Sequence, residues 1–135
     1  MSQSFKVFIK SALDVSIVRD ALERSLNIKL VGEADDNPPG FYHWSTDTLG
    51  LNLWFCDGHD YVEDSIDFPA YRYEIDICWN GVSLEWNGGL DKEYSDQWRH
   101  DFAVVVANIL SKRLNCECIA VKDVFSIIAK FEPGD

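Results

Sequence analysis

The chain has 135 residues, of which 47% are hydrophobic and 13% aromatic, and it carries 23 acidic residues against 12 basic ones. The apolar content is too high for a disordered chain, and the length fits a single domain over residues 1–135. The net charge of -11 excludes the basic surface that direct nucleic-acid binding requires, and it disfavours binding to an anionic membrane for the same reason.

The first third of the sequence predicts a strand, a helix and a second strand. Every second residue from Phe5 to Ile9 is apolar, which is typical of a strand. Asp14 is a suitable N-cap for a helix over residues 15–26, where apolar side chains recur at helical spacing. Residues 29–33 predict a short strand, and the run DDNPPG over residues 35–40 predicts a loop.

The middle third is typical of antiparallel strands joined by turns. Residues 49–56 and 71–79 both alternate apolar and polar side chains, whereas the stretch 57–70 between them is irregular. Asn80–Gly81 follows the second run, and residues 82–86 resume the alternation. An Asn-Gly pair between two alternating runs predicts a β-hairpin with a type I′ turn.

The last third changes to helical periodicity. Apolar residues predict a helix over residues 92–114, and the cations Lys112 and Arg113 complement the dipole at its C-terminal end. Ile119 and Val121 predict a further strand, whereas residues 124–131 fit either a strand or a short helix. We therefore predict an α+β fold, in which a mostly antiparallel sheet of five to seven strands packs one face against two main helices.

The predicted hairpin places like charges together. Its two-residue turn puts Asp76 opposite Glu85, with Glu74 on the same face. Carboxylates opposite each other destabilise a sheet by a few tenths to about 1 kcal/mol. Solvent or an internal cation such as Arg72 or a lysine could neutralise them, a bound metal cation could do so, or a partner could supply the positive charge. The acidic residues of the 57–67 stretch do not match a calcium-binding loop, which disfavours the metal.

The negative charge is concentrated in one part of the chain. Residues 57–96 hold eleven acidic and two basic residues, a net charge of -9, and the other 95 residues carry only -2. Such a field accelerates and orients the approach of a basic protein, and Trp54, on the polar face of its predicted strand, could anchor it. The predicted partner-binding residues are Trp54, Asp60, Glu63, Asp64, Asp67, Glu74, Asp76 and Glu85.

The sequence contains no complete catalytic or metal-binding motif. Cys56 and His59 form the best available nucleophile and base, but no motif places them together, so we predict no catalytic residue and no enzyme. The pair Cys116 and Cys118 lacks two further ligands for zinc, so we predict no metal and no cofactor. The N-terminal residues do not resemble a secretory signal, which favours reduced cysteines and a cytoplasmic location.

The chain resembles the bacterial toxin-immunity proteins of contact-dependent growth-inhibition and related polymorphic toxin systems. The resemblance lies in size, acidity, aromatic content and mixed strand and helix order, and in the stretches FYHWSTDTLGLNLWFCDG, YRYEIDICWNGVSLEWNGG and QWRHDFAVVVANIL. It implies a protein that binds a cognate toxin C-terminal domain, often a nuclease, and blocks its active site or substrate surface. An acidic adaptor, a DNA-mimic inhibitor of another enzyme and a small ligand-binding protein remain alternatives.

Overall fold

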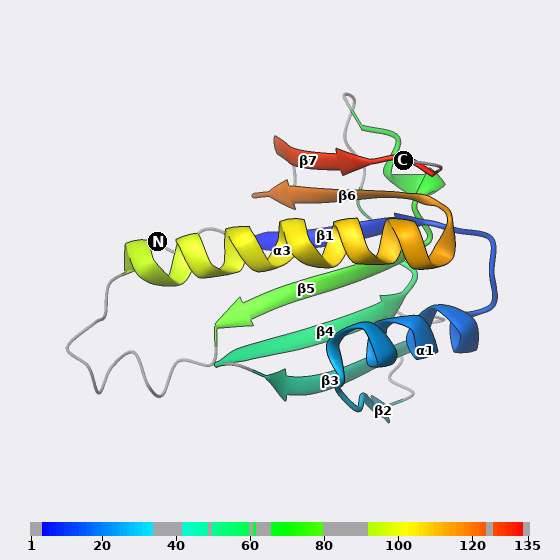
Figure 1. The fold of residues 1–135 in the computed structure, drawn as a ribbon, viewed down its shortest axis with the longest axis horizontal. Helices are drawn as coiled ribbons and strands as arrows, with labels where there is room; N and C mark the ends of the chain where they lie inside the picture. Colours follow the sequence, from blue (N-terminus) through cyan, green and yellow to red (C-terminus); the bar gives the residue numbers. More distant parts are fainter. Residues whose placement is uncertain are drawn as a thin grey trace.

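The computed structural model describes residues 4–33, 42–48, 50–59, 61, 66–79, 92–123 and 126–133. Its elements are β1 (Phe5–Lys10), α1 (Val15–Leu26), β2 (Val31–Glu33), β3 (Tyr42–Thr48), β4 (Leu51–Asp57), the 3-10 helix η1 (Phe68–Ala70), β5 (Tyr73–Trp79), α3 (Lys92–Leu114), β6 (Glu117–Lys122) and β7 (Ser126–Phe131). Figure 1 shows them in chain order from blue to red.

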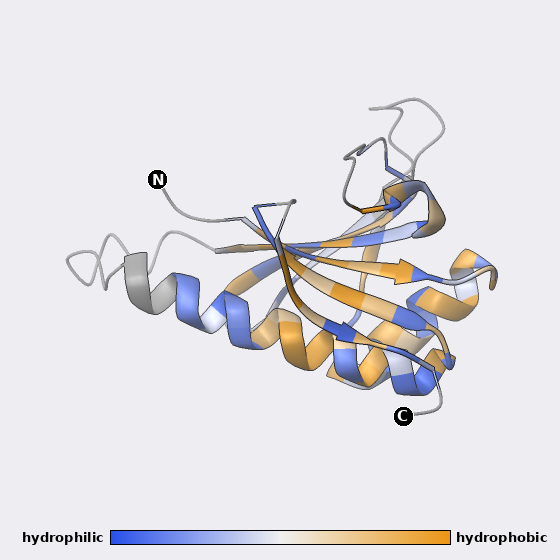
Figure 2. Ribbon diagram, turned by 90° about the horizontal axis from the view of Figure 1, so that it is seen from above, coloured by the Kyte–Doolittle hydropathy of each residue, from blue (hydrophilic) through white to orange (hydrophobic). Residues whose placement is uncertain are grey.

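The described strands form one antiparallel sheet of seven, in the order β2-β3-β4-β5-β1-β6-β7. Helix α3 runs across the middle of this sheet, and α1 lies over its β3–β4 side (Figure 1). Seen from above, both helices lie on the same side of the sheet (Figure 2). The predicted α+β fold, with two helices on one face of an antiparallel sheet, is confirmed.

Local sequence explains where α1 begins and ends. The carboxylate of Asp14 accepts a hydrogen bond from the backbone N–H of Ser16, which is otherwise unpaired at a helix start. Asn27 adopts a left-handed conformation with φ 52°, and its N–H donates to the carbonyl of Glu23. Asparagine tolerates this conformation better than most residues, so the helix stops there.

The main core lies between the sheet and the helices. The period-2 alternation of the strands places one row of apolar side chains on the helix-facing side, where α1 and α3 cover them. Burying these side chains is the dominant stabilising contribution to the fold. The fully buried members include Val7, Ile9, Leu51, Leu53, Phe55, Tyr73 and Ile75 from the sheet, and Val18, Leu22, Ala107 and Leu110 from the helices.

Strand β5 lies in the centre of the sheet, which overturns the predicted hairpin pairing. Over residues 73–77 its two edges pair with β1 and β4, so neither edge remains for another strand. Asp76 lies opposite Lys6 on one side and opposite Trp54 on the other. Glu85 is outside the described residues, but with both edges of β5 occupied the predicted pairing of Asp76 with Glu85 is wrong.

Three further points concern the strands. Residues 126–131 form β7, so the ambiguous segment 124–131 is a strand where it is described. Strand β3 was not predicted, although it connects the short edge strand β2 to β4. The turn Asn80–Gly81 and the strand predicted over residues 82–86 lie outside the described residues.

Candidate functional site

The candidate site lies on the face of the sheet opposite the helices. Alternation directs Lys6, Trp54, Cys56, Glu74 and Asp76 to this face, because their strand neighbours fill the helix-facing core. One corner of this face is covered by a second apolar cluster that includes side chains from residues 66–71. Its members are Phe8, Ile66, Phe68, Tyr71, Ile119 and Val121.

Two carboxylates share one ammonium group next to this corner. Lys6 Nζ is 2.8 Å from Glu74 Oε1 and 3.2 Å from Asp76 Oδ2. Lys6 and Glu74 are almost completely buried, whereas the Asp76 side chain retains 32% of its exposure. We name these three residues the Lys6 cluster. With both carboxylates ionised, it holds one more negative charge than positive.

The environment of the cluster shifts the protonation of its members. Burial alone would lower the pKa of the Lys6 ammonium, but Glu74 and Asp76 outweigh it and raise that pKa above its ordinary value. Burial raises the pKa of Glu74 above its ordinary value, and the attraction of Lys6 opposes this only in part. Lys6 is therefore charged at neutral pH, and Glu74 takes up a proton more readily than an exposed glutamate does.

An aromatic group closes one side of the cluster. Lys6 Nζ lies 5.2 Å from the centre of the Tyr61 ring, within the range of a cation–π contact. Tyr61 meets Phe8 edge to face at 5.9 Å between ring centroids. Tyr61 thus connects the Lys6 cluster to the second apolar cluster, to which Phe8 belongs.

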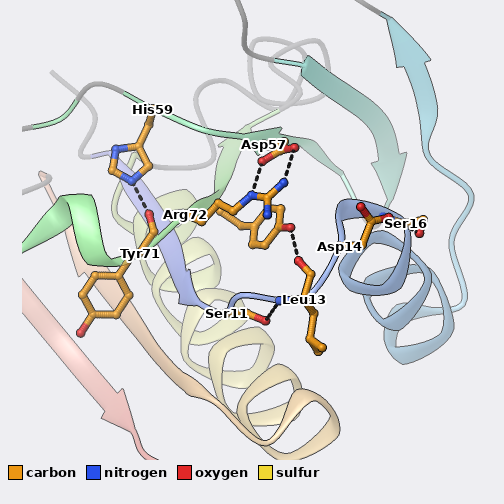
Figure 3. Close-up of polar contacts among 9 residues, drawn as sticks. Ser11, Leu13, Asp14, Ser16, Asp57, His59, Tyr71 and Arg72 are labelled. Carbon is orange, nitrogen blue, oxygen red and sulfur yellow. Dashed lines mark hydrogen bonds and ion pairs between the residues drawn. The ribbon is translucent and has the colours of Figure 1, made fainter.

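Both ring nitrogens of His59 form hydrogen bonds within this corner of the sheet face. Its Nε2 contacts the carbonyl oxygen of Tyr71 (Figure 3), and the two atoms are 2.6 Å apart. Its Nδ1 accepts the backbone N–H of Tyr61 at 3.3 Å. A carbonyl cannot donate, so Nε2 carries the proton and both ring nitrogens are engaged. His59 therefore offers no nitrogen for general-base catalysis in this arrangement.

Cys56 is equally unsuited to nucleophilic attack. It lies opposite Glu74 in the sheet, and burial followed by the charges of Glu74 and Asp76 raises the pKa of its thiol to about 12. The thiol is protonated at neutral pH, and the thiolate is the reactive form. The geometry therefore does not support Cys56 and His59 as a catalytic pair.

The predicted partner-binding residues fall into three groups. Trp54, 37% exposed, and Asp76 are direct neighbours on the sheet face away from the helices, and Asp67 is exposed elsewhere. Glu74 is only 5% exposed and is held by Lys6, so the expectation that it presents a carboxylate at the surface is wrong. The remaining four, Asp60, Glu63, Asp64 and Glu85, lie outside the described residues.

Internal cations neutralise much of the acidic segment where it is described. Arg72 donates two hydrogen bonds to Asp57, at 2.9 and 3.2 Å (Figure 3), and Arg99 contacts Asp96 at 2.5 Å. Together with the Lys6 cluster, these pairs engage four of the five described acidic side chains of residues 57–96. Lys6 is the lysine that neutralises Glu74 and Asp76. The sequence alone did not identify it, because it lies 68 residues before Glu74 in the chain.

Comparison with known proteins assigns no family. No family model matches the chain, and neither does any curated protein or solved structure. Within the described residues, no group of three or more histidine, cysteine or acidic side chains is arranged to hold a metal ion. No helix in this part of the chain has both the length and the apolar character needed to cross a bilayer.

Proposed function

We propose that the chain is a cytoplasmic immunity protein, which binds and neutralises one cognate, basic toxin domain of the nuclease type without catalysis of its own. The observation that carries this proposal is the surplus negative charge of the Lys6 cluster, whose partly exposed member, Asp76, lies opposite the partly exposed Trp54 on the sheet face away from the helices. The resemblance in size, acidity and element order described above is consistent with it.

The position of the charge favours a protein partner with a cationic surface. Asp76 is neither fully solvated nor fully buried, so its charge interacts with a docked cation more strongly than a surface carboxylate does. Nucleases carry basic clefts because they bind phosphates. An acidic sheet face can occupy such a cleft and exclude the nucleic acid from it.

The rigidity of the surface favours specific binding. Trp54 and Asp76 belong to β4 and β5, two interior strands that are hydrogen-bonded on both edges. The backbone of such strands is already ordered before a partner docks, which reduces the entropic cost of association. Tryptophan is also enriched among the few residues that dominate binding energy at protein interfaces.

The proposal is tested with the toxin domain encoded beside the gene for this chain. We expect co-expression to restore growth of cells that produce the toxin domain, and the two purified proteins to form a complex. Association should slow when the salt concentration rises, because exposed charges are then screened. Failure to rescue growth, together with no complex at low salt, would overturn the proposal.

A further inference from the structure

Cys116 and Cys118 are in direct contact at the junction between α3 and β6. Their Sγ atoms are 3.8 Å apart, and both residues belong to the main core. We propose that this pair is an oxidative modification site, at which a peroxide oxidises Cys116 and Cys118 then closes an intramolecular disulfide. The site lies on the other side of the sheet from the Lys6 cluster, and the proposal is independent of the proposed function.

The spacing of the two cysteines permits a disulfide. Cys118 belongs to β6, and Cys116 directly precedes this strand. Side chains two residues apart in an extended segment point to the same face, and their Cα atoms are about 6.4–6.8 Å apart. This separation is at the upper end of the range of about 4.4–6.8 Å that disulfides span. The sulfur atoms must approach from 3.8 Å to about 2.0 Å, a movement that rotation of the two side chains can share.

The fold holds both cysteines in place before they react. The backbone N–H of Cys116 donates to the carbonyl of Ser111 at 3.2 Å, and its carbonyl accepts the Ser111 hydroxyl at 2.8 Å. Cys118 is paired across the sheet with Ile9 of β1 and with Phe131 of β7. The two sulfur atoms are therefore kept in contact by α3 and by two neighbouring strands, which favours reaction between them.

The two thiols differ in ways that assign their roles. Cys116 retains 8% exposure, whereas Cys118 is completely buried. The hydrogen bond with Cys118 lowers the pKa of the Cys116 thiol, and the same hydrogen bond together with burial raises the pKa of the Cys118 thiol. Because the thiolate is the nucleophilic form, Cys116 reacts with the peroxide first and Cys118 reacts with the product.

The oxidation takes two steps. The thiolate of Cys116 attacks one oxygen of hydrogen peroxide, the O–O bond breaks, hydroxide leaves, and Cys116 becomes a sulfenic acid. The sulfur of Cys118 then attacks the sulfenic sulfur, the S–O bond breaks, and the hydroxyl group leaves as water with the thiol proton of Cys118. The two sulfur atoms lose two electrons in total. The hydroxide takes up the proton that Cys116 released, so the peroxide is reduced to two molecules of water.

The disulfide should be easily reduced. Its Cα separation is at the limit of what a disulfide spans, and strained disulfides have more oxidising potentials than relaxed ones. In a reducing compartment the pair is therefore a dithiol at rest, and disulfides formed there are transient. Thiol reductants should return the oxidised pair to the dithiol.

The other two cysteines of the chain serve as internal controls. Cys56 is opposite Glu74 in the register of β4 and β5, whereas Cys78 is opposite Asn52, so the two cysteines are four residues out of register. Four residues along a strand span about 13 Å, which is too far for a disulfide. Both also lie on the sheet face away from the core that holds the proposed pair.

Peptide mapping tests the proposal. Folded protein is treated with hydrogen peroxide, then with catalase, and is alkylated in urea and digested with trypsin. Cleavage after Arg113 and Lys122 gives one peptide, residues 114–122, that carries both cysteines of the pair. We expect this peptide to lose two hydrogen atoms and to resist alkylation, and dithiothreitol to restore both thiols, while Cys56 and Cys78 remain open to alkylation. The proposal is overturned if both thiols of the peptide stay open to alkylation at a peroxide exposure that closes the pair in urea-unfolded protein.

Two matched variants test the order of the steps. Cys118→Ser leaves the sulfenic acid of Cys116 without a second thiol, so dimedone, which traps sulfenic acids, should label Cys116. Cys116→Ser makes the same change at the other position, and labelling of Cys118 should be slower by about tenfold or more. Circular dichroism checks that both variants are folded, and Cys118→Ala replaces Cys118→Ser if the buried hydroxyl prevents folding. Equal labelling in the two variants, or none in either, contradicts the proposal.

Discussion

Lys6 and Glu74, 68 residues apart in sequence, form an ion pair of 2.8 Å in the interior of the sheet, and both side chains are almost completely buried. The pair exists because β1, the first strand, is inserted between β5 and β6. The ammonium of Lys6 therefore neutralises part of the negative charge that the sequence concentrates in residues 57–96. The remaining imbalance lies at Asp76, beside Trp54.

Removing the ammonium should destabilise the protein far more than removing the buried carboxylate. Lys6→Met leaves the buried Glu74 without a counter-charge, and we expect it to lower the free energy of unfolding by about 3–5 kcal/mol. Glu74→Gln keeps Lys6 paired with Asp76 and should cost about 1 kcal/mol or less. Urea unfolding at pH 7 measures both, and equal losses would contradict the description of the cluster.

The stability contribution of Glu74 should depend on pH in a defined direction. Its folded-state pKa is raised above the ordinary value of 4.5, chiefly by burial, so the folded protein binds this proton more tightly than the unfolded chain does. The resulting stabilisation is fully present below pH 4.5 and is lost as the pH rises through the folded value. The free energy of unfolding of Glu74→Gln relative to wild type should therefore increase from pH 4 to pH 7, and a constant or falling difference would refute the shift.

A methyl group at Gly32 should disrupt the β2 edge of the sheet. Gly32 lies opposite Trp44, and an added Cβ would be 2.2 Å from the indole nitrogen. Trp44 packs near Phe55, with 5.6 Å between ring centroids, and Arg19 lies 5.3 Å from its ring, so the indole cannot move freely. We expect Gly32→Ala to cost about 1–3 kcal/mol in thermal unfolding. The cost should shrink in a Trp44→Phe background, and an undiminished cost there would point to a different cause.

The thiol of Cys56 should react slowly with alkylating reagents in the folded protein. Its pKa of about 12 leaves only about one thiol in ten thousand ionised at pH 8, compared with roughly a quarter for a free cysteine. Alkylation by iodoacetamide, followed peptide by peptide with mass spectrometry, should be much slower at Cys56 in folded protein than in urea-unfolded protein. Rapid alkylation of the folded form at neutral pH would revive the possibility of a reactive cysteine.

Local sequence patterns predict the helices and the strand faces because those features depend on near neighbours. The N-cap Asp14 and the apolar spacing after it locate α1, and the alternation over residues 71–79 identifies the buried face of β5. Strand β3 was missed because residues 42–48 are mostly polar; among the described side chains of this strand, Trp44 packs against the core. Phe8 interrupts the polar face of β1, and this is the sequence signal for the second apolar cluster.

The order of the strands was not predictable from the same patterns. An Asn-Gly pair after β5 favours a partner that is adjacent in sequence, whereas the structure pairs β5 with β1 and β4. The pairing with β1 depends on burying Phe5, Val7 and Ile9 between the sheet and α3, which is a property of the whole core. The role of Lys6 follows from that pairing, so it could not be assigned before the sheet order was known.

The most direct test of the account is the affinity of the cognate toxin domain for wild type, Asp76→Asn and Asp67→Asn, measured by biolayer interferometry at low and at moderate salt. The account predicts that Asp76→Asn weakens binding by about tenfold or more, whereas Asp67→Asn changes it by less than about twofold. Equal affinities of the two variants for the toxin domain would contradict the assignment of the partner's cation to Asp76.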